Sequence, residues 1–199
     1  MPIGKIVKLI VLWINRYSST QIESEINCSP TTIVDYRNFF RELCIKIEKR
    51  YGMIGGGDEE IVELDEIAVH SRKYGRRDKE RELTRILGGR RRLTKNVFAL
   101  ITPTRSSKTM IPIIREKVHS QSIIHSDLSK AYVLSKDGEV IHTNNIESFW
   151  QRLKKPLVMA NGTSEQLLPS YISESVVREN EKDNFGEMII EESREFRSG

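Results

Sequence analysis

Apolar residues near the N-terminus recur with helical spacing. The spacing predicts a first helix over 5–16, with its apolar face formed by Ile6, Leu9, Ile10, Trp13 and Ile14. Polar residues at 17–19 interrupt the pattern. Thr20 with Glu23 fits a capping box, which predicts a second helix over 21–26.

A third helix is indicated by its capping residues. Ser29 suits an N-cap, and Pro30 suits the first helical position. The helix is expected to run from Pro30 to about Arg50. Three short helices in this order predict a helix-turn-helix DNA-binding domain over 1–50, although similar bundles exist that bind no DNA. The expected DNA contacts lie early in the third helix, at Thr31, Thr32, Arg37 and Asn38.

The chain changes character after a glycine-rich segment. Gly55, Gly56 and Gly57 disfavour a helix, so 51–57 is expected to be a linker. A second domain over 58–178 should follow. Its predicted strands are 60–65, 83–87, 97–102 and 122–126, with Gly88-Gly89 between the second and third strands and a helix over 106–118. This order indicates an α/β fold with a mixed sheet.

The C-terminal third is predicted to be helical and then disordered. Asn145 should open a helix that ends near Leu157, and another helix is expected over 164–177. Residues 171–199 hold four Lys or Arg and eight Asp or Glu. We therefore expect 179–199 to be an acidic, disordered tail.

A basic stretch lies in the middle of the chain. Residues 72–95 hold eleven Lys or Arg and three Asp or Glu. This stretch predicts contacts to DNA phosphates from Arg72, Lys73, Arg76 and Arg77. A solvated loop or a nuclear-import signal is the alternative interpretation.

Neither a membrane span nor a disulfide framework is indicated. The uninterrupted apolar run 9–14 is too short to cross a bilayer, and no small-residue cleavage site follows it. Cys28 and Cys44 form no CxxC pair. The sequence therefore predicts a protein that is neither secreted nor bound to a membrane.

Three acidic residues are candidates for metal-dependent chemistry. Asp65 is expected at or near the end of the first strand, Asp127 directly follows the fourth, and Glu147 lies early in the helix after it. Parallel neighbouring strands would bring the two aspartates together. Lys154 lies two helical turns after Glu147 and therefore on the same face. Carboxylates suit Mg²⁺ or Mn²⁺, and two such ions can stabilise phosphoryl transfer.

Each of these residues also has a simpler interpretation. Asp127 could only cap a helix, and Glu147 could only complement a helix dipole. Lys154 could be ordinary surface charge. Glu63 and Glu66 are rival ligands, and we expect their side chains to point to the face of the strand opposite Asp65.

Several motifs together resemble a known family. They are Val62–Glu66, Arg72–Arg76, Gly88-Gly89, Ile123–Asp127 with Ala131-Tyr132, His142–Trp150, and Gly162–Ser164 with Leu167-Leu168 and Ser170-Tyr171. This set, over about 53–178, is similar to the Merlin-type transposase domain that certain bacterial insertion sequences share.

The resemblance implies a fold and an activity. It implies a ribonuclease-H-like DDE transposase that binds the terminal inverted repeats of its element in double-stranded DNA. The enzyme would cut and join strands with a two-metal site of Mg²⁺ or Mn²⁺. Asp65, Asp127 and Glu147 would be the metal-binding catalytic acids, and Lys154 their basic companion. We expect a homo-oligomer on DNA, in the nucleus of a eukaryote or otherwise in the cytoplasm.

One interval departs from the family pattern. Nineteen residues separate Asp127 from Glu147, whereas relatives carry a further strand and a loop there. Val140-Ile141 is the remnant of that strand, or the strand is missing. Three functions therefore remain open. The first is a DNA transposase, active or as a truncated or inactive copy; the second is a domesticated, non-catalytic DNA-binding protein; the third is a nuclease that uses the same acids without transposition.

Overall fold

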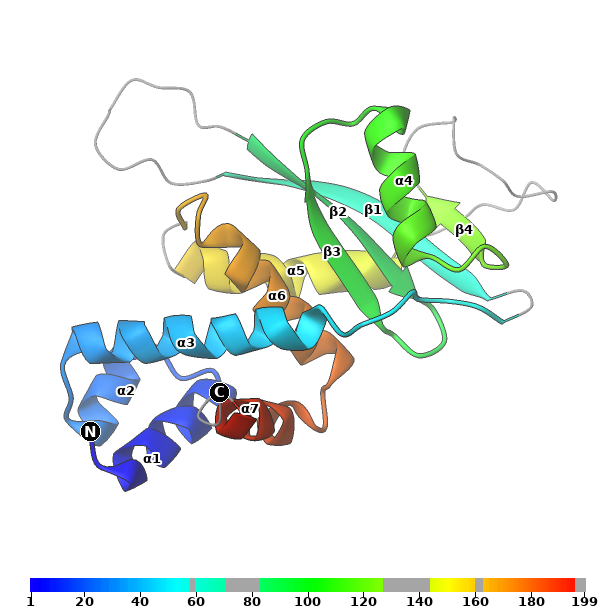
Figure 1. Ribbon diagram of the computed structural model, residues 1–199. Coiled ribbons are helices and arrows are strands. Elements are labelled where there is room, and N and C mark those ends of the chain that lie inside the picture. The colour runs from blue at the N-terminus through cyan, green and yellow to red at the C-terminus, as the bar shows by residue number, and fades with distance from the viewer. Residues whose placement is uncertain (58–59, 71–82, 127–143, 160–162, 196–199) are drawn as a thin grey trace, which may run out of the picture.

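The protein consists of a helical part and a sheet part that lie side by side. The structure is a computed structural model that describes residues 1–57, 60–70, 83–126, 144–159 and 163–195. Figure 1 shows α1, α2, α3 and α7 together below, and the sheet with α4 and α5 above. Helix α6 connects the two parts.

The three predicted N-terminal helices are confirmed. They are α1 (Ile3–Ile14), α2 (Ser19–Ile26) and α3 (Pro30–Glu48). Ser29 caps α3 as expected, and its hydroxyl accepts a hydrogen bond from the amide of Thr32 at 3.2 Å. The expected capping box of α2 is wrong. Ser18 and Gln21 form it instead, because the helix begins two residues earlier than the sequence pattern indicated.

The expected disorder of the C-terminal tail is wrong. Helix α7 spans Phe185–Glu195, and it buries Phe185 and Ile189 in the core of the N-terminal helices. The apolar residues on one face of α7 lie against Trp13 and its neighbours, and this burial offsets the entropy of ordering an acidic segment. The predicted last helix is shifted along the chain: α6 spans Leu168–Asn180.

Helix α6 also holds the end of α1. Arg178 donates hydrogen bonds to the carbonyl oxygens of Ile14 and Trp13 at 2.8 and 3.0 Å. Those carbonyls belong to the last turn of α1, whose carbonyls lack the usual donor four residues later, and that of Trp13 also accepts from the amide of Arg16 at 2.9 Å. The C-terminal helices are therefore part of the fold of the N-terminal helices.

The sheet confirms the mixed α/β fold with a helical region before it. Its strands are β1 (Ile61–His70), β2 (Leu83–Arg91), β3 (Val97–Thr102) and β4 (Ile123–Ser126), in the order β3-β2-β1-β4. Strands β1, β2 and β3 pair antiparallel, and β4 pairs parallel with β1. The possible further strand at 140–141 lies outside the described residues.

Two sequence expectations about the strands need correction. Asp65 does not end its strand, because β1 continues to His70 through antiparallel pairing with β2. Gly88 and Gly89 do not separate two strands but lie inside β2. A glycine in a strand interior often marks a place where another group comes close to the backbone.

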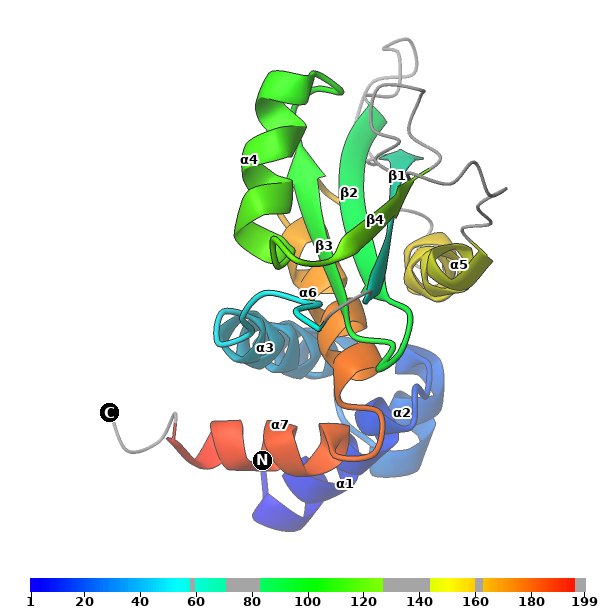
Figure 2. The same cartoon turned by 90° about the vertical axis from the view of Figure 1, so that its right-hand side faces the viewer.

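Helices cover the two faces of the sheet. Figure 2 shows α4 (Ser107–Lys117) on one face and α5 (Asn144–Met159) on the other. Both helices were expected from the sequence, and Pro112 lies inside α4. On the α5 side, Ile146, Phe149, Trp150 and Leu153 pack with α6 against the sheet. On the α4 side, a separate apolar core includes Leu64, Phe98 and Met110.

The glycine-rich segment before β1 is non-helical, as expected, but it is packed. Gly55 and Gly56 have positive φ angles of 90° and 114°, which side-chain-bearing residues rarely adopt. Ile54 is buried and pairs in parallel with Val118. In the part of the chain that the structure describes, no helix has the length and apolar character needed to cross a bilayer.

Candidate functional site

Asp65 lies in the middle of β1, on the face that α5 covers. Its Oδ2 accepts a hydrogen bond from Nε1 of Trp150 at 2.9 Å, and its Oδ1 accepts one from the amide of Glu66 at 2.7 Å. The carboxylate is partly buried. Helix α5 therefore contacts the first predicted catalytic acid directly.

A glycine makes room for the contact between Asp65 and Trp150. Gly88 of β2 is the cross-strand partner of Asp65. A Cβ atom at Gly88 would lie only 2.3 Å from Cη2 of Trp150. Any larger residue would push the indole off the sheet. The Gly88-Gly89 motif of the sequence is explained in part by this close approach.

Glu63 joins β1 to the start of α5. Its side chain is 0% exposed. One oxygen, Oε2, accepts hydrogen bonds from the amides of Asn145 and Ile146 at 3.1 and 3.2 Å. The other, Oε1, accepts from Nδ2 of Asn145 at 2.7 Å and from Nε of Arg92 at 3.0 Å. Glu63 thus satisfies helix donors that have no partner inside a helix.

The expectation that Glu63 would point away from Asp65 is wrong. Residues two apart on a strand share a face, and both side chains contact α5. The expectation is confirmed for Glu66, which lies one residue after Asp65. Its carboxylate is bound on the other side by Arg85 at 3.0 Å and by Arg105 at 2.9 Å. The period of two along a strand could have placed Glu63 on the face of Asp65 from the sequence alone. Its contacts with the start of α5 could not be predicted in that way.

Glu147 and Lys154 lie on the exposed side of α5. The buried side of that helix is formed by Ile146, Phe149, Trp150, Leu153 and Leu157. Glu147 follows Ile146 directly, and it precedes Trp150 by one helical turn. Glu147 therefore belongs to the turn that Glu63 holds, on the same helix that contacts Asp65.

Strand β4 ends beside β1. The parallel register pairs Leu64 with Ser126, which are the residues directly before Asp65 and Asp127. Asp127 itself lies outside the described residues. The condition on which the sequence argument depended, that these two strands are parallel neighbours, is met by the described residues.

No metal site can be read from the described residues alone. Among them, no three His, Cys, Asp or Glu side chains gather in an arrangement that suits a metal ion. Asp65 and Glu147 are described, and the third expected acid is not. The expected Mg²⁺ or Mn²⁺ site therefore stays a prediction.

A buried polar cluster that the sequence did not indicate fixes α5 against β2 and α6. Arg90 of β2 donates hydrogen bonds to the carbonyl of Asn145 at 3.0 Å and to Oγ of Ser148 at 3.2 Å. It also pairs with Glu179 of α6 at 3.1 Å. Arg152 of α5 binds the same Glu179 at 2.8 Å. Arg90 belongs to the basic stretch 72–95, but it is buried in this cluster. Its guanidinium is therefore not available to contact a DNA phosphate.

The pKa of Glu179 reflects its basic neighbours. Burial alone would raise the pKa of this carboxyl group. The hydrogen bonds from Arg152 and Lys182 and the charge of Arg90 outweigh burial and lower the pKa below its ordinary value. Glu179 is therefore ionised in the folded protein.

The predicted DNA-contacting residues of α3 differ in exposure. Thr31 is exposed, and Thr32 bonds to the hydroxyl of Ser29 at 2.9 Å. Arg37 donates hydrogen bonds to the carbonyl of Tyr17 and to Oγ of Ser19, both at 3.2 Å, and burial lowers the pKa of its guanidinium. Asn38 accepts a hydrogen bond from Arg41. Arg72, Lys73, Arg76 and Arg77 lie outside the described residues.

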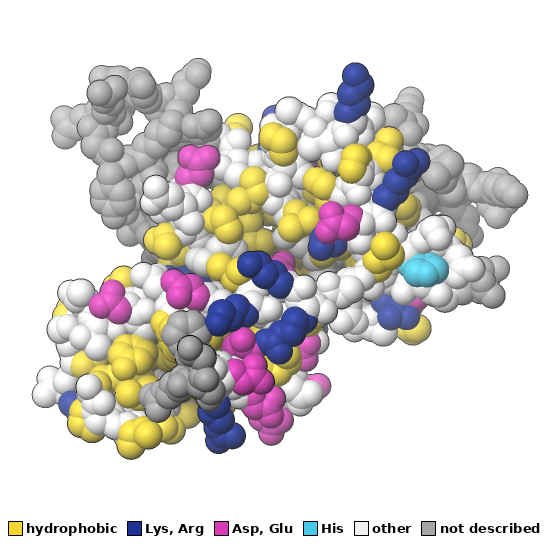
Figure 3. Space-filling view, in the orientation of Figure 1, with side chains coloured by type: hydrophobic (Ala, Val, Ile, Leu, Met, Phe, Trp, Pro, Cys, Tyr) yellow, Lys and Arg dark blue, Asp and Glu magenta, His cyan; other side chains and the backbone are white. Residues whose placement is uncertain are grey.

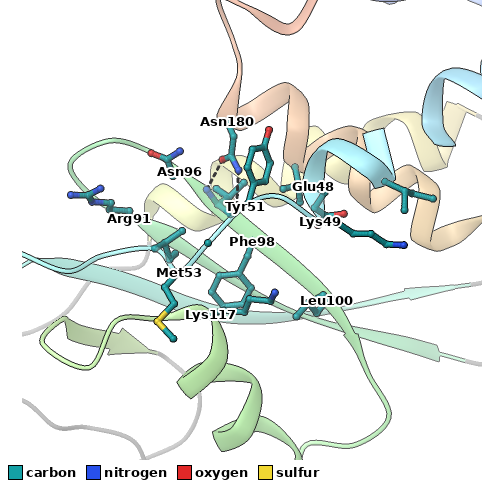
Figure 4. Close-up of a pocket in the computed structure, with 15 residues that line it drawn as sticks. Glu48, Lys49, Tyr51, Met53, Arg91, Asn96, Phe98, Leu100, Lys117 and Asn180 are labelled. Carbon is teal, nitrogen blue, oxygen red and sulfur yellow. Dashed lines mark hydrogen bonds between the residues drawn. The ribbon is translucent and has the colours of Figure 1, made fainter. Parts of the chain in front are cut away.

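A separate cavity lies where the helical part meets the sheet. It has a volume of about 420 Å³ and is lined by α3, the segment after it, β3, α4 and α6. In Figure 4, Tyr51 and Phe98 face this space, and Asn180 bonds to Val97 at its rim. Figure 3 shows basic side chains gathered near the middle of the same face. Asp65, Glu147 and Lys154 are not among its lining residues.

Comparison with known proteins gives one partial likeness. The chain is similar to an uncharacterized transposase-like protein of Haemophilus influenzae, with 29% identity over an alignment of 93 residues that covers 39% of this chain and 76% of that protein. No family model matches the chain.

Proposed function

We propose that this chain is a DNA transposase, of the DDE type with a Merlin-type catalytic domain. The likeness to a transposase-like bacterial protein supports the general class of function. The strand order β3-β2-β1-β4, with β4 parallel to β1, supports a ribonuclease-H-like sheet. The DDE assignment depends on the site.

The observation that carries the proposal is the contact between Asp65 and α5. A DDE site needs one acid from the first strand, one from the end of the parallel neighbour, and one from a helix packed on the same face. Trp150 bonds to Asp65 from the helix that holds Glu147. Leu64 pairs with Ser126, the residue directly before Asp127, and this register supports a position for Asp127 close to Asp65.

The residues at the site fit a hard divalent cation. Carboxylate oxygens are the ligands that Mg²⁺ and Mn²⁺ prefer. The Asp65 carboxylate accepts hydrogen bonds from Trp150 and from the amide of Glu66, and a carboxylate oxygen that accepts a hydrogen bond can also coordinate a cation. Asp65, Asp127 and Glu147 would hold the metal, which would neutralise charge on the phosphoryl group when bound.

Other residues of the protein would position the Asp65 carboxylate and contact the DNA. Trp150 fixes the rotamer of Asp65 through its indole N–H, so that carboxylate is aimed before substrate binds. Lys154, exposed two turns after Glu147, would contact a DNA phosphate beside the reacting bond. Thr31 at the start of α3 would contact the inverted repeat.

The proposal is tested by a cleavage and joining assay. Purified full-length chain is incubated with Mn²⁺ and DNA that carries the inverted repeats flanking its gene. We expect nicked and joined products from wild type and none from Asp65→Ala. Asp183→Asn, a charge change at an exposed acid between α6 and α7, is the matched control and should keep the wild-type yield.

The other outcomes separate the alternatives. Equal yields from wild type and Asp65→Ala would overturn the catalytic proposal. Specific binding to the repeats in that case would favour a non-catalytic DNA-binding protein. Cleavage that needs Asp65 but never joins strands would favour a nuclease.

A further inference from the structure

We propose that Glu63 is the positioning residue for Glu147. In this role, Glu63 fixes the first turn of α5 on β1 and thereby sets the place of Glu147 relative to Asp65. The inference rests on the proposed function, because it assigns Glu63 a part in the same site. The sequence offered Glu63 only as a rival metal ligand that points away from Asp65, and did not indicate this role.

The contacts of Glu63 are those of a helix cap supplied from another element. Helix N-termini are usually capped by a residue directly before the helix. Here the amides of Asn145 and Ile146 donate to a carboxylate that lies 82 and 83 residues earlier in the chain. A negative charge at this end also complements the helix dipole.

The contact between Glu63 and the start of α5 is buried. The Glu63 side chain is 0% exposed, and Arg92 offsets its charge at 3.0 Å. An ionised carboxylate in such a place is stable only while its donors stay in position. The first turn of α5 therefore cannot move away from β1 without taking three hydrogen-bond donors from a buried carboxylate.

Glu63 lies between the strand of Asp65 and the helical turn of Glu147. Glu147 is the residue immediately after Ile146, whose amide binds Glu63. Asp65 lies two residues after Glu63 on the same face of β1. One side chain thus links the strand of the first acid to the turn of the third. Displacement of a catalytic group by 1 Å can cost about 10²-fold in rate.

A matched glutamate allows this role to be separated from general stability. Glu66 lies on the same strand, its side chain is 1% exposed, and it also pairs with arginines, but its partners Arg85 and Arg105 are outside α5. Glu63→Gln and Glu66→Gln remove the same charge from the same strand. Only the first change weakens the cap of α5.

The experiment compares these two variants in full-length protein. We expect Glu63→Gln to lower kcat for strand cleavage by about 10- to 100-fold, with KM for DNA within about twofold of wild type. Glu66→Gln should leave kcat within about threefold. Hydrogen exchange at the amides of Asn145 and Ile146 should quicken in Glu63→Gln and stay unchanged in Glu66→Gln.

The readouts distinguish the two possible failures. Equal loss of kcat in both variants, or wild-type kcat in Glu63→Gln, would overturn the positioning role. If wild type is no more active than Asp65→Ala, the proposed function fails, and hydrogen exchange then decides whether Glu63 holds α5: unchanged exchange in Glu63→Gln overturns that as well. Should Glu63→Gln not fold, Asn145→Ala removes the 2.7 Å side-chain bond to Glu63 and gives the same test.

Discussion

The two faces of β1 each bury a glutamate, and the two glutamates differ in what they hold. Glu63 faces α5 and accepts hydrogen bonds from backbone amides of that helix. Glu66 faces the α4 side and is bound by Arg85 and Arg105, whose side chains are 33% and 65% exposed. Glu63 therefore fixes the start of a helix, whereas Glu66 forms ion pairs with arginine side chains.

This difference bears on where function lies in the sheet. The α5 face carries Asp65, Gly88 and Trp150, which contact one another closely. The α4 face has a separate apolar core that includes Leu64 and Phe98. Substitutions on the α5 face are expected to disturb both stability and site, and those on the α4 face stability alone.

The largest effect is expected when the two glutamates are removed in turn. Glu63→Ala should lower the free energy of unfolding by about 3 to 5 kcal/mol, because the amides of Asn145 and Ile146 lose a buried acceptor and Arg92 loses its ion pair. Glu66→Ala should cost only about 1 to 2 kcal/mol, since its arginine partners can reach water and, among the described residues, no helix amide depends on it. Urea denaturation measures both. Equal costs would contradict the comparison.

The next effect concerns the two glycines of β2. Gly88→Ala should lower the free energy of unfolding by about 1 to 3 kcal/mol, because its Cβ would overlap the Trp150 ring. Gly89→Ala should also destabilise, through Phe98 on the other face, without reducing activity beyond the loss of folded protein. Gly52→Ala, with open space around it, is the control and should be neutral. Thermal unfolding with an activity assay separates the three.

A smaller effect is expected from the indole N–H. Trp150→Phe keeps an aromatic ring at this position, but it removes the donor to Asp65 and the outer indole carbons, Cζ2 and Cη2, that lie closest to Gly88. We expect the lost hydrogen bond to cost about 1.5 kcal/mol, the lower end of the usual range for a hydrogen bond to a charged group. Activity should fall further than stability explains. Phe149→Leu, a change at the neighbouring buried ring, is the control for ring packing, and equal activity losses in both would argue against a role for the N–H.

The smallest effect is a pH dependence from Glu179. Its pKa is lowered in the folded protein, so it stabilises the fold above the ordinary carboxyl value of 4.5. That contribution is lost as pH falls through the lowered pKa. The free energy of unfolding should therefore decline below about pH 4.5 in wild type, and less steeply in Glu179→Gln. Chemical denaturation from pH 3 to 7 measures the slope, and equal slopes in both proteins would contradict the assignment.

Much of the local structure could be predicted from the sequence. Ser29-Pro30 predicts the start of α3, and the apolar repeat 6–14 predicts α1, because caps and periodicity act within a few residues. The strands and the mixed α/β class were also predictable. The length of β1 beyond Asp65 was not, because its extension depends on pairing with β2, about twenty residues away.

The sequence named the candidate acids but not the contacts around them, and their role at a metal site stays a prediction. Asp65 and Glu147 followed from motifs, and the structure brings the helix of the second against the strand of the first. Glu63 was considered as a rival ligand but placed on the wrong face, and the roles of Arg90 and Glu179 were missed, because each is an ordinary charged residue in its own segment. Their roles arise only where β1, β2, α5 and α6 meet.

The sequence by itself determined where most of the helices and strands lie, except α7 and the second half of β1, and it offered acids of a type that suits a metal, whose role stays a prediction. Tertiary structure alone decided that α7 packs on the N-terminal helices, that Trp150 lies on Gly88, and that Glu63 caps α5. The physical reason is distance along the chain. Caps and periodicity act between near neighbours, whereas a buried carboxylate and the amides that it binds are joined only after strand and helix have packed.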